Sequence, residues 1–251
     1  MSDPRSPNPT PYSPTPTPTT GPLVTPAGSE SRTIPDARTQ QALLTQAFLW
    51  MFVGLAVTAG VAYFVQSNAR LLEFTGSNWF ILLVGQFILA MGISFGIRRI
   101  SATAALGAFF VYAASLGLTI GLIVSFYTTG SVATAFLSAS AMFGAAAIYG
   151  HVTKRSLARL GGLLFMGLIG LLVASVINIF LLNDTVSWVI SIIGVVIFTA
   201  LTAYDVQRIQ NGDLAVYTGS VEKAAVLGAL HLYLDFVNLF LFLLRLFGAR
   251  D

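Results

Sequence analysis

Apolar residues dominate the chain from residue 42 onward, in long runs separated by short polar joins. Each of seven runs is close to the roughly 20 residues that a helix needs to cross the hydrocarbon core of a bilayer. Charged and turn-forming residues collect in joins such as "RRIS", "TTGS" and "HVTKRSLAR". We therefore predict seven membrane-spanning helices, at approximately residues 42–66, 78–97, 103–127, 132–150, 160–182, 186–207 and 224–247.

The composition agrees with an all-α integral membrane protein. Of the 251 residues, 55% are hydrophobic and only 9% are charged, and the mean hydropathy is +0.80. The formal net charge is +3, but the Lys and Arg residues flank apolar runs singly or in pairs, which is not the pattern of a nucleic-acid-binding protein. Seven spans leave no room for a soluble catalytic domain. Because the chain has no cysteine, disulfides and thiolate metal sites are excluded.

The N-terminal segment has a different character. All ten prolines lie within residues 1–35, where the sequence reads "SPNPTPYSPTPTPTTGP" at its densest. We predict that residues 1–38 form a disordered tail rich in Pro, Thr and Ser, followed by a transmembrane domain over residues 39–251. No apolar core follows the first basic residue, so the tail is not expected to be a signal peptide.

The distribution of basic residues predicts the orientation, because cytoplasmic loops retain more Lys and Arg than translocated ones. One side of the predicted bundle collects nine: Arg32, Arg38, Arg98, Arg99, Lys154, Arg155, Arg159, Arg208 and Lys223. The other side has Arg70, Arg245 and Arg250. The N-terminus is therefore expected in the cytoplasm and the C-terminus outside.

Two carboxylates lie inside predicted spans. Asp205 is near the inner end of the sixth, in "FTALTAYDVQRIQ", and Asp235 is well inside the seventh. An ionisable residue at mid-membrane costs roughly 2.5–3.5 kcal/mol on insertion scales, which favours a functional role. A hairpin turning at their midpoint, Ser220, would place both at similar depth. In contact, they would share one proton and form a pH sensor. The alternative is that each carboxylate bonds separately to a hydroxyl or backbone amide and is only structural.

Other polar residues accompany this pair. His231, Asp235 and Asn238 share one face of the seventh span, and Tyr204 precedes Asp205. His231 could tune the titration of the acid or bind metal with it, but a hydrogen-bonding role is expected, since one HxxxD pair is a weak metal signal. Arg98, at the inner end of the second span, could fold back to Asp205 and favour its ionised form.

Small residues mark sites of helix packing. The stretches "GISFG" (92–96), "GLTIG" (117–121) and "FGAAAIYG" (143–150) would allow close approach of neighbouring helices. We expect packing inside the bundle from them.

The motifs "TAYDVQRIQ" and "LYLDFVNLFLFLLRLFG", with an Arg pair closing the second of seven spans, resemble the bacterial branch of the Bax inhibitor-1 family. The resemblance covers roughly residues 40–248. It implies a seven-helix bundle with the last helix central, acting in the bacterial plasma membrane as a pH-sensitive calcium leak. It further implies that Asp205 and Asp235 share a proton, and that Arg98 helps to latch the cytoplasmic end of the pore.

Calcium is then the permeant ion, held weakly and transiently by Asp205 and Asp235, and no cofactor is expected. The partners are membrane lipid, calcium and protons. Deprotonation would let Arg98 and the aspartates rearrange and open the cytoplasmic side.

Two other functions stay open. An intramembrane aspartyl protease also places two aspartates on adjacent helices, with a pair like Tyr204–Asp205. That class, however, has Gly-x-Gly-Asp where this chain has "LYLD", and its Pro-Ala-Leu motif cannot occur after Pro35. The third possibility is a non-conducting protein that regulates a membrane-protein partner.

Overall fold

The computed structural model describes residues 36–249 of the chain. Within that range, seven helices are long and apolar enough to cross a membrane. They are α1 (Ala37–Gln66), α3 (Trp79–Gly96), α4 (Ala102–Val124), α5 (Thr129–Val152), α6 (Ala158–Leu181), α7 (Asp184–Gln210) and α9 (Val221–Phe247). The predicted all-α bundle of seven spans is confirmed, and most helix ends lie within a few residues of their predicted positions.

The first helix begins earlier than predicted. Asp36 is its N-cap, and the carboxylate accepts a hydrogen bond from the backbone N–H of Thr39 at 3.1 Å. A side chain in this position satisfies one of the amides that a helix start leaves free. Ala37 and Arg38, which we assigned to the tail, therefore belong to α1. The remainder of the tail prediction, residues 1–35, lies outside the described residues.

Two short helices lie in the polar joins between the predicted spans. In α2 (Ala69–Ser77), the side chain of Asn68 accepts hydrogen bonds from the first turn. The other, α8 (Asp213–Thr218), is bounded by Gly212 and Gly219, both with positive φ (77° and 71°). Both helices are too short to span a membrane, so no long apolar run in the sequence marks them.

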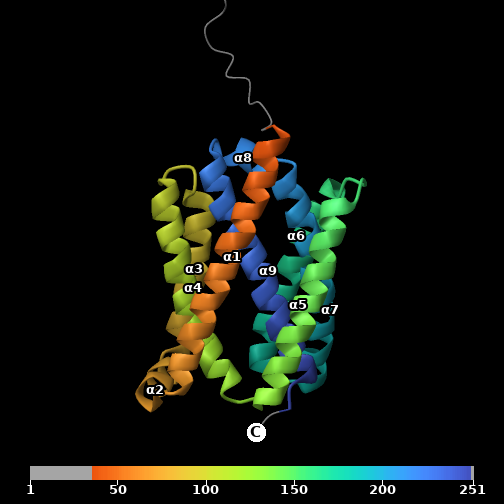
Figure 1. Ribbon diagram of the computed structural model, residues 1–251. Helices are drawn as coiled ribbons and strands as arrows, with labels where there is room; N and C mark the ends of the chain where they lie inside the picture. Colours follow the sequence, from red (N-terminus) through yellow and green to blue (C-terminus); the bar gives the residue numbers. More distant parts are fainter. Residues whose placement is uncertain (1–35, 250–251) are drawn as a thin grey trace, which may run out of the picture. The chain divides into compact units, whose positions relative to one another are not determined.

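The last helix is the most buried of the seven. In its most apolar window, 72% of α9 is buried, compared with 11% for α3 and for α6. It packs against α1, α4, α5 and α7, and runs inside the bundle in Figure 1. By contrast, α3 packs mainly on α4 and α6 on α7. Their outward faces expose large apolar side chains such as Phe95 and Phe165, as expected of helices that contact lipid.

Glycines set the closest helix contacts. A Cβ atom on Gly117 would lie 2.7 Å from Cβ of Val61, and one on Gly121 would lie 2.9 Å from the carbonyl oxygen of Ala62. The stretch "GLTIG" therefore packs α4 directly on α1, as predicted. Gly150 packs in the same way on the backbone of Ala203. Gly92 has open space where its side chain would be, as does Gly96, so the packing predicted for "GISFG" is wrong within the described chain.

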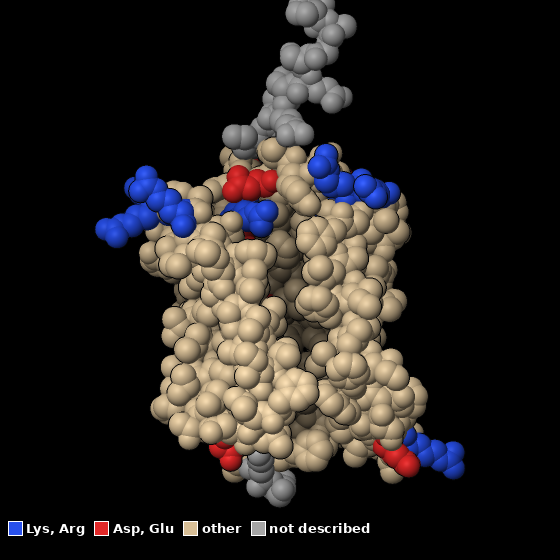
Figure 2. Space-filling view, turned by 180° about the vertical axis from the view of Figure 1, so that it is seen from behind, with Lys and Arg blue, Asp and Glu red and all other residues tan. Residues whose placement is uncertain are grey.

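Charged side chains lie mainly at the two ends of the bundle. On the face shown in Figure 2, the band between these ends is uncharged at its surface. One end carries eight basic residues, namely Arg38, Arg98, Arg99, Lys154, Arg155, Arg159, Arg208 and Lys223, and the opposite end carries Arg70 and Arg245. The chain is thus a multi-pass membrane protein.

Candidate functional site on the seam between helices α7 and α9

The antiparallel helices α7 and α9 meet along a seam with a clear register. Gly228 of α9 lies against Ile209 of α7, and a Cβ atom added to it would be 3.0 Å from Ile209 Cδ1. Farther along, Gly194 of α7 lies against the ring of Phe242. In both pairs, the midpoint between the two residue numbers falls at residues 218–219. The chain reverses there through α8 and its flanking glycines, rather than through a hairpin at Ser220.

This register places Asp205 opposite His231. The two side chains are 3.7 Å apart, measured from Asp205 Oδ1 to His231 Nδ1. Asp205 is buried, with 8% of its surface exposed, and His231 is partly buried. Among the described residues, His231 is the only basic side chain within 4.0 Å of a carboxylate. When protonated, it would be a direct counter-charge for Asp205.

Asp235 lies deeper in the bundle. It follows His231 by four residues on α9, or about 6 Å along the helix axis. It is 4% exposed, and its Oδ2 atom is buried without a hydrogen-bond partner in the described part of the chain. Asp205 is close enough to interact with it electrostatically. The two acids are therefore neighbours, but the expectation of similar depth is wrong by about one helical turn, because α8 shifts the register.

The remaining members of the predicted polar face are not joined to this group. Asn238 donates a hydrogen bond through Nδ2 to the carbonyl oxygen of Leu234, one turn earlier on its own helix, at 2.8 Å. Tyr204 points to the other side of α7: a Cβ atom on Gly161 of α6 would lie 2.6 Å from its hydroxyl oxygen. Adjacent helix positions differ by about 100°, so Tyr204 and Asp205 face different neighbours.

Arg98 does not reach Asp205 in this structure. It is exposed in the join between α3 and α4, and its guanidinium carbon lies 6.0 Å from the ring centroid of Tyr217 in α8. Its carbonyl oxygen accepts a hydrogen bond from Lys223 Nζ at 3.3 Å. Arg98 therefore contacts the α8 segment that links the two helices of the seam, while His231 stands next to the carboxylate.

Sequence reasoning missed a buried hydroxyl network on the other side of α9. The hydroxyl of Tyr233 lies 2.6 Å from Thr58 Oγ1 of α1, and Thr58 Oγ1 also lies 2.9 Å from the carbonyl oxygen of Ala113 in α4. Since the Thr58 hydroxyl has one hydrogen, which goes to a carbonyl, Tyr233 acts as the donor to Thr58. Tyr233 is fully buried, two residues before Asp235. The network fixes α9 to α1 and α4 beside the acid.

A second polar contact holds α3 on α4. Gln86, which is 7% exposed, donates hydrogen bonds through Nε2 to the carbonyl oxygen of Ser115 and to Thr119 Oγ1, both at 2.8 Å. Residues 36–249 contain no group of three or more His, Asp and Glu side chains that could hold a metal ion. Any cation at Asp205 and Asp235 would therefore need oxygens from the backbone, from hydroxyls or from water.

Comparisons with known proteins agree over most of the chain. Residues 40–251 match a family model described as the inhibitor of apoptosis-promoting Bax1. The inner membrane protein YbhL of Escherichia coli is 41% identical over 216 residues, which cover 84% of this chain and 92% of that protein. An uncharacterized protein of Deinococcus radiodurans is 39% identical over 227 residues, which cover 90% of this chain and 96% of that one.

Proposed function

This chain belongs to the Bax inhibitor-1 family, in its bacterial branch, and we propose that it acts as a pH-sensitive leak channel for calcium. Asp205 and Asp235 would be the pH sensor and the weak cation site of the channel. Resident cofactors, catalysis and nucleic acid have no part in this proposal. The proposed location is the bacterial inner membrane, with the N-terminus in the cytoplasm and the C-terminus outside.

One observation carries the proposal: two buried carboxyl groups and a partly buried imidazole lie together on the seam of the most buried helix. Ionised groups in such a place are costly unless they are paired. His231 can pair with Asp205, whereas Asp235 Oδ2 has no hydrogen-bond partner within the described residues. A proton on Asp235 removes the repulsion between the acids and keeps the seam closed.

Loss of that proton would open the seam. Two neighbouring carboxylates then repel each other, and their oxygens attract water and cations. Calcium prefers oxygen ligands, and a site with only two carboxylates binds it weakly enough to release it. The calcium flux should therefore rise as the pH increases.

Arg98 would act on this transition through α8. Its contacts with Tyr217 and Lys223 connect the join between α3 and α4 to the segment that turns α7 into α9. Movement of α7 away from α9 would have to shift that segment. The arginine latch is therefore proposed as a tether on α8, not as a direct ion pair with Asp205.

The test is calcium flux into liposomes that contain a calcium-sensitive dye, measured at a series of pH values between about 6 and 8. We expect the wild-type flux to rise several-fold over this range. Asp235→Asn cannot lose a proton, so its flux should lose the pH response. Asp205→Asn should weaken the response, because the repulsion between the acids disappears.

Asp184→Asn is the matched control, since Asp184 is exposed in the first turn of α7, about 30 Å along the helix from Asp205. It should leave both the flux and its pH dependence unchanged. If Asp205→Asn and Asp235→Asn also behave like wild type, the two acids do not gate the protein and the proposal is wrong.

A further inference from the structure

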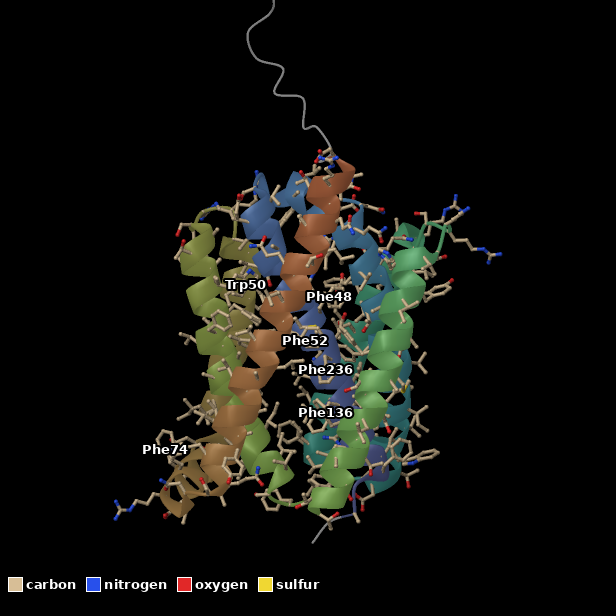
Figure 3. All side chains as sticks on the ribbon, viewed as in Figure 1. Phe48, Trp50, Phe52, Phe74, Phe136 and Phe236 are labelled. Atoms are coloured by element: carbon tan, nitrogen blue, oxygen red, sulfur yellow. The ribbon has the colours of Figure 1, made fainter. Side chains whose placement is uncertain are left out.

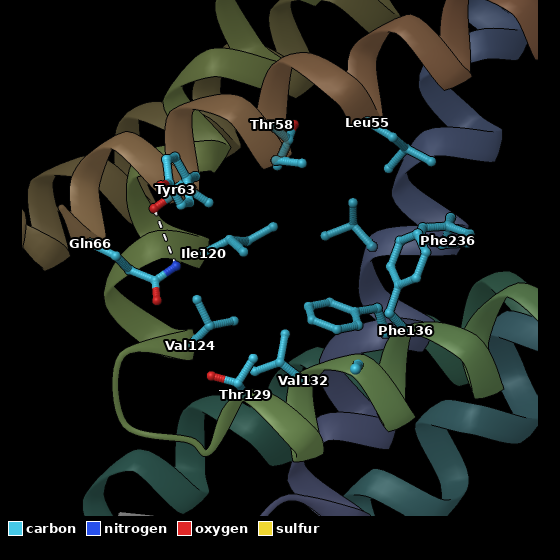
Figure 4. A pocket seen from close by; sticks show the side chains of 15 residues that line it. Leu55, Thr58, Tyr63, Gln66, Ile120, Val124, Thr129, Val132, Phe136 and Phe236 are labelled. Carbon is cyan, nitrogen blue, oxygen red and sulfur yellow. Dashed lines mark hydrogen bonds between the residues drawn. The ribbon is translucent and has the colours of Figure 1, made fainter.

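A second feature of the bundle is an apolar groove between α1 and α5. Its volume is about 350 Å³, within the range of small-molecule sites in proteins. Residues of α9 and α4 form its floor and its side. Figure 4 shows Leu55 and Gln66 of α1 facing Val132 and Phe136 of α5 across the open space, with Phe236 of α9 beside Phe136.

The groove exists because α1 and α5 touch at one level and then separate. Phe48 of α1 and Phe143 of α5 meet edge to face, with ring centroids 6.4 Å apart. Beyond this contact α1 follows α4, on which it packs closely at Gly117 and Gly121. In Figure 3, Phe136 and Phe236 lie in the gap that results between α1 and α5.

The length of the groove matches one leaflet of a membrane. It follows α1 from Leu55 to Gln66, the last residue of that helix. Eleven residues of helix span about 16 Å, close to half of the roughly 30 Å hydrocarbon core. The groove therefore runs from near the middle of the bilayer to the surface where α1 ends.

The polarity of the groove changes along its length as the polarity of a phospholipid does, from an apolar inner part to a polar outer end. The walls are apolar except at the end of α1, where the side chains of Gln66 and Thr129 border the groove (Figure 4). The Thr58 hydroxyl, farther in, already bonds to Tyr233 and Ala113. Water would find few partners in such a space, and an empty groove would forgo the dispersion contacts of its walls.

We propose that this groove binds one acyl chain of a glycerophospholipid from the leaflet on the side where α1 ends. The ester region would lie beside Gln66 and Thr129, and the chain would extend along Phe136 and Phe240 toward Leu55. Since Phe236 directly follows Asp235, the bound chain would pack beside the helix that carries the buried acid. The site does not depend on calcium conduction.

The experiment uses vesicles of phosphatidylethanolamine and phosphatidylglycerol that contain a small fraction of phosphatidylethanolamine with a photoreactive acyl chain. After illumination, labelled peptides of the full chain are identified by mass spectrometry. We expect the labelling to concentrate on the groove residues of α5 and α9, several-fold above the exposed faces of α3 and α6.

Ala133→Trp would fill the groove from α5 and should reduce this labelling several-fold. Ala145→Trp is the matched control, because Ala145 is an exposed alanine on the same helix outside the groove. If Ala133→Trp does not fold, Ala59→Trp fills the same space from α1. Labelling spread evenly over all lipid-facing helices, labelling unaffected by filling the groove, or cross-links to a second copy of the chain at this place would each overturn the proposal.

Discussion

His231 is the residue whose position most changes the interpretation of the site. The position of Arg98 at the inner end of the second span suggested it as the cation beside Asp205, but His231 occupies that place, 3.7 Å away. A protonated imidazole favours the ionised form of a neighbouring carboxyl group. His231 therefore contributes to the charge balance of the proposed gate.

We therefore predict that His231→Gln shifts the pH dependence of calcium flux to higher pH. Without a positive charge beside them, the two acids should hold their shared proton more firmly, so the seam opens later as the pH rises. The measurement is the pH of half-maximal flux in the dye-loaded liposomes. His151→Gln, at the exposed end of α5, changes the only other histidine of the chain and should leave that pH unchanged. An identical flux profile for the two variants would exclude a role for His231.

Some residues of the site could be predicted from the sequence and others could not. Asp205 and Asp235 could be predicted because a carboxylate inside an apolar run has few ordinary explanations. Thr58 and Tyr233 could not, because hydroxyl groups are common in membrane spans and these two residues are 175 positions apart. Their contact depends on how α1 crosses α9, which hydropathy does not describe.

Between helices, close approach depends on a few glycines. The α1–α4 contact at Gly117 leaves no room for a side chain, because a Cβ atom there would lie 2.7 Å from Val61 Cβ and 2.8 Å from the Thr58 carbonyl oxygen. We predict that Gly117→Val destabilises the protein by about 1–3 kcal/mol, the usual cost of overpacking. The midpoint of thermal unfolding in detergent should fall accordingly.

Gly92→Val is the control for this prediction, since it is the same substitution inside another spanning helix, at a position with open space. It should leave the unfolding midpoint nearly unchanged. If the unfolding midpoint falls equally in both variants, helix propensity, rather than the packing of α4 on α1, determines the loss of stability.

The register between helices α7 and α9 could not be predicted from the sequence. The spans themselves follow from apolar length, but the level at which they face each other depends on the join. The midpoint between the acids, Ser220, suggested a simple hairpin, whereas Gly212 and Gly219 adopt positive φ and enclose the short helix α8. A glycine in the sequence does not show which of its allowed conformations it takes.

For the whole molecule, the orientation decides which compartment the proposed gate senses. Asp205 lies five residues before the end of α7, at the end of the bundle that carries eight of the ten basic residues in the described range. If the basic end is cytoplasmic, as the distribution of charge predicts, the seam is nearest to cytoplasmic pH. The acyl-chain groove, which reaches the opposite end of α1, would then take a lipid of the outer leaflet.

The absence of cysteine from the chain permits a direct test of this orientation, because any introduced cysteine is the only thiol. Ser156→Cys lies in the join between α5 and α6, at the basic end, and Ser77→Cys ends α2 at the other. Both positions are exposed, so a difference in labelling reports the side of the membrane. A thiol reagent that does not cross membranes, applied to intact spheroplasts, should label Ser77→Cys at once and Ser156→Cys only after permeabilisation. The reverse order would invert the bundle, and the buried acids would then sense the pH outside the cell.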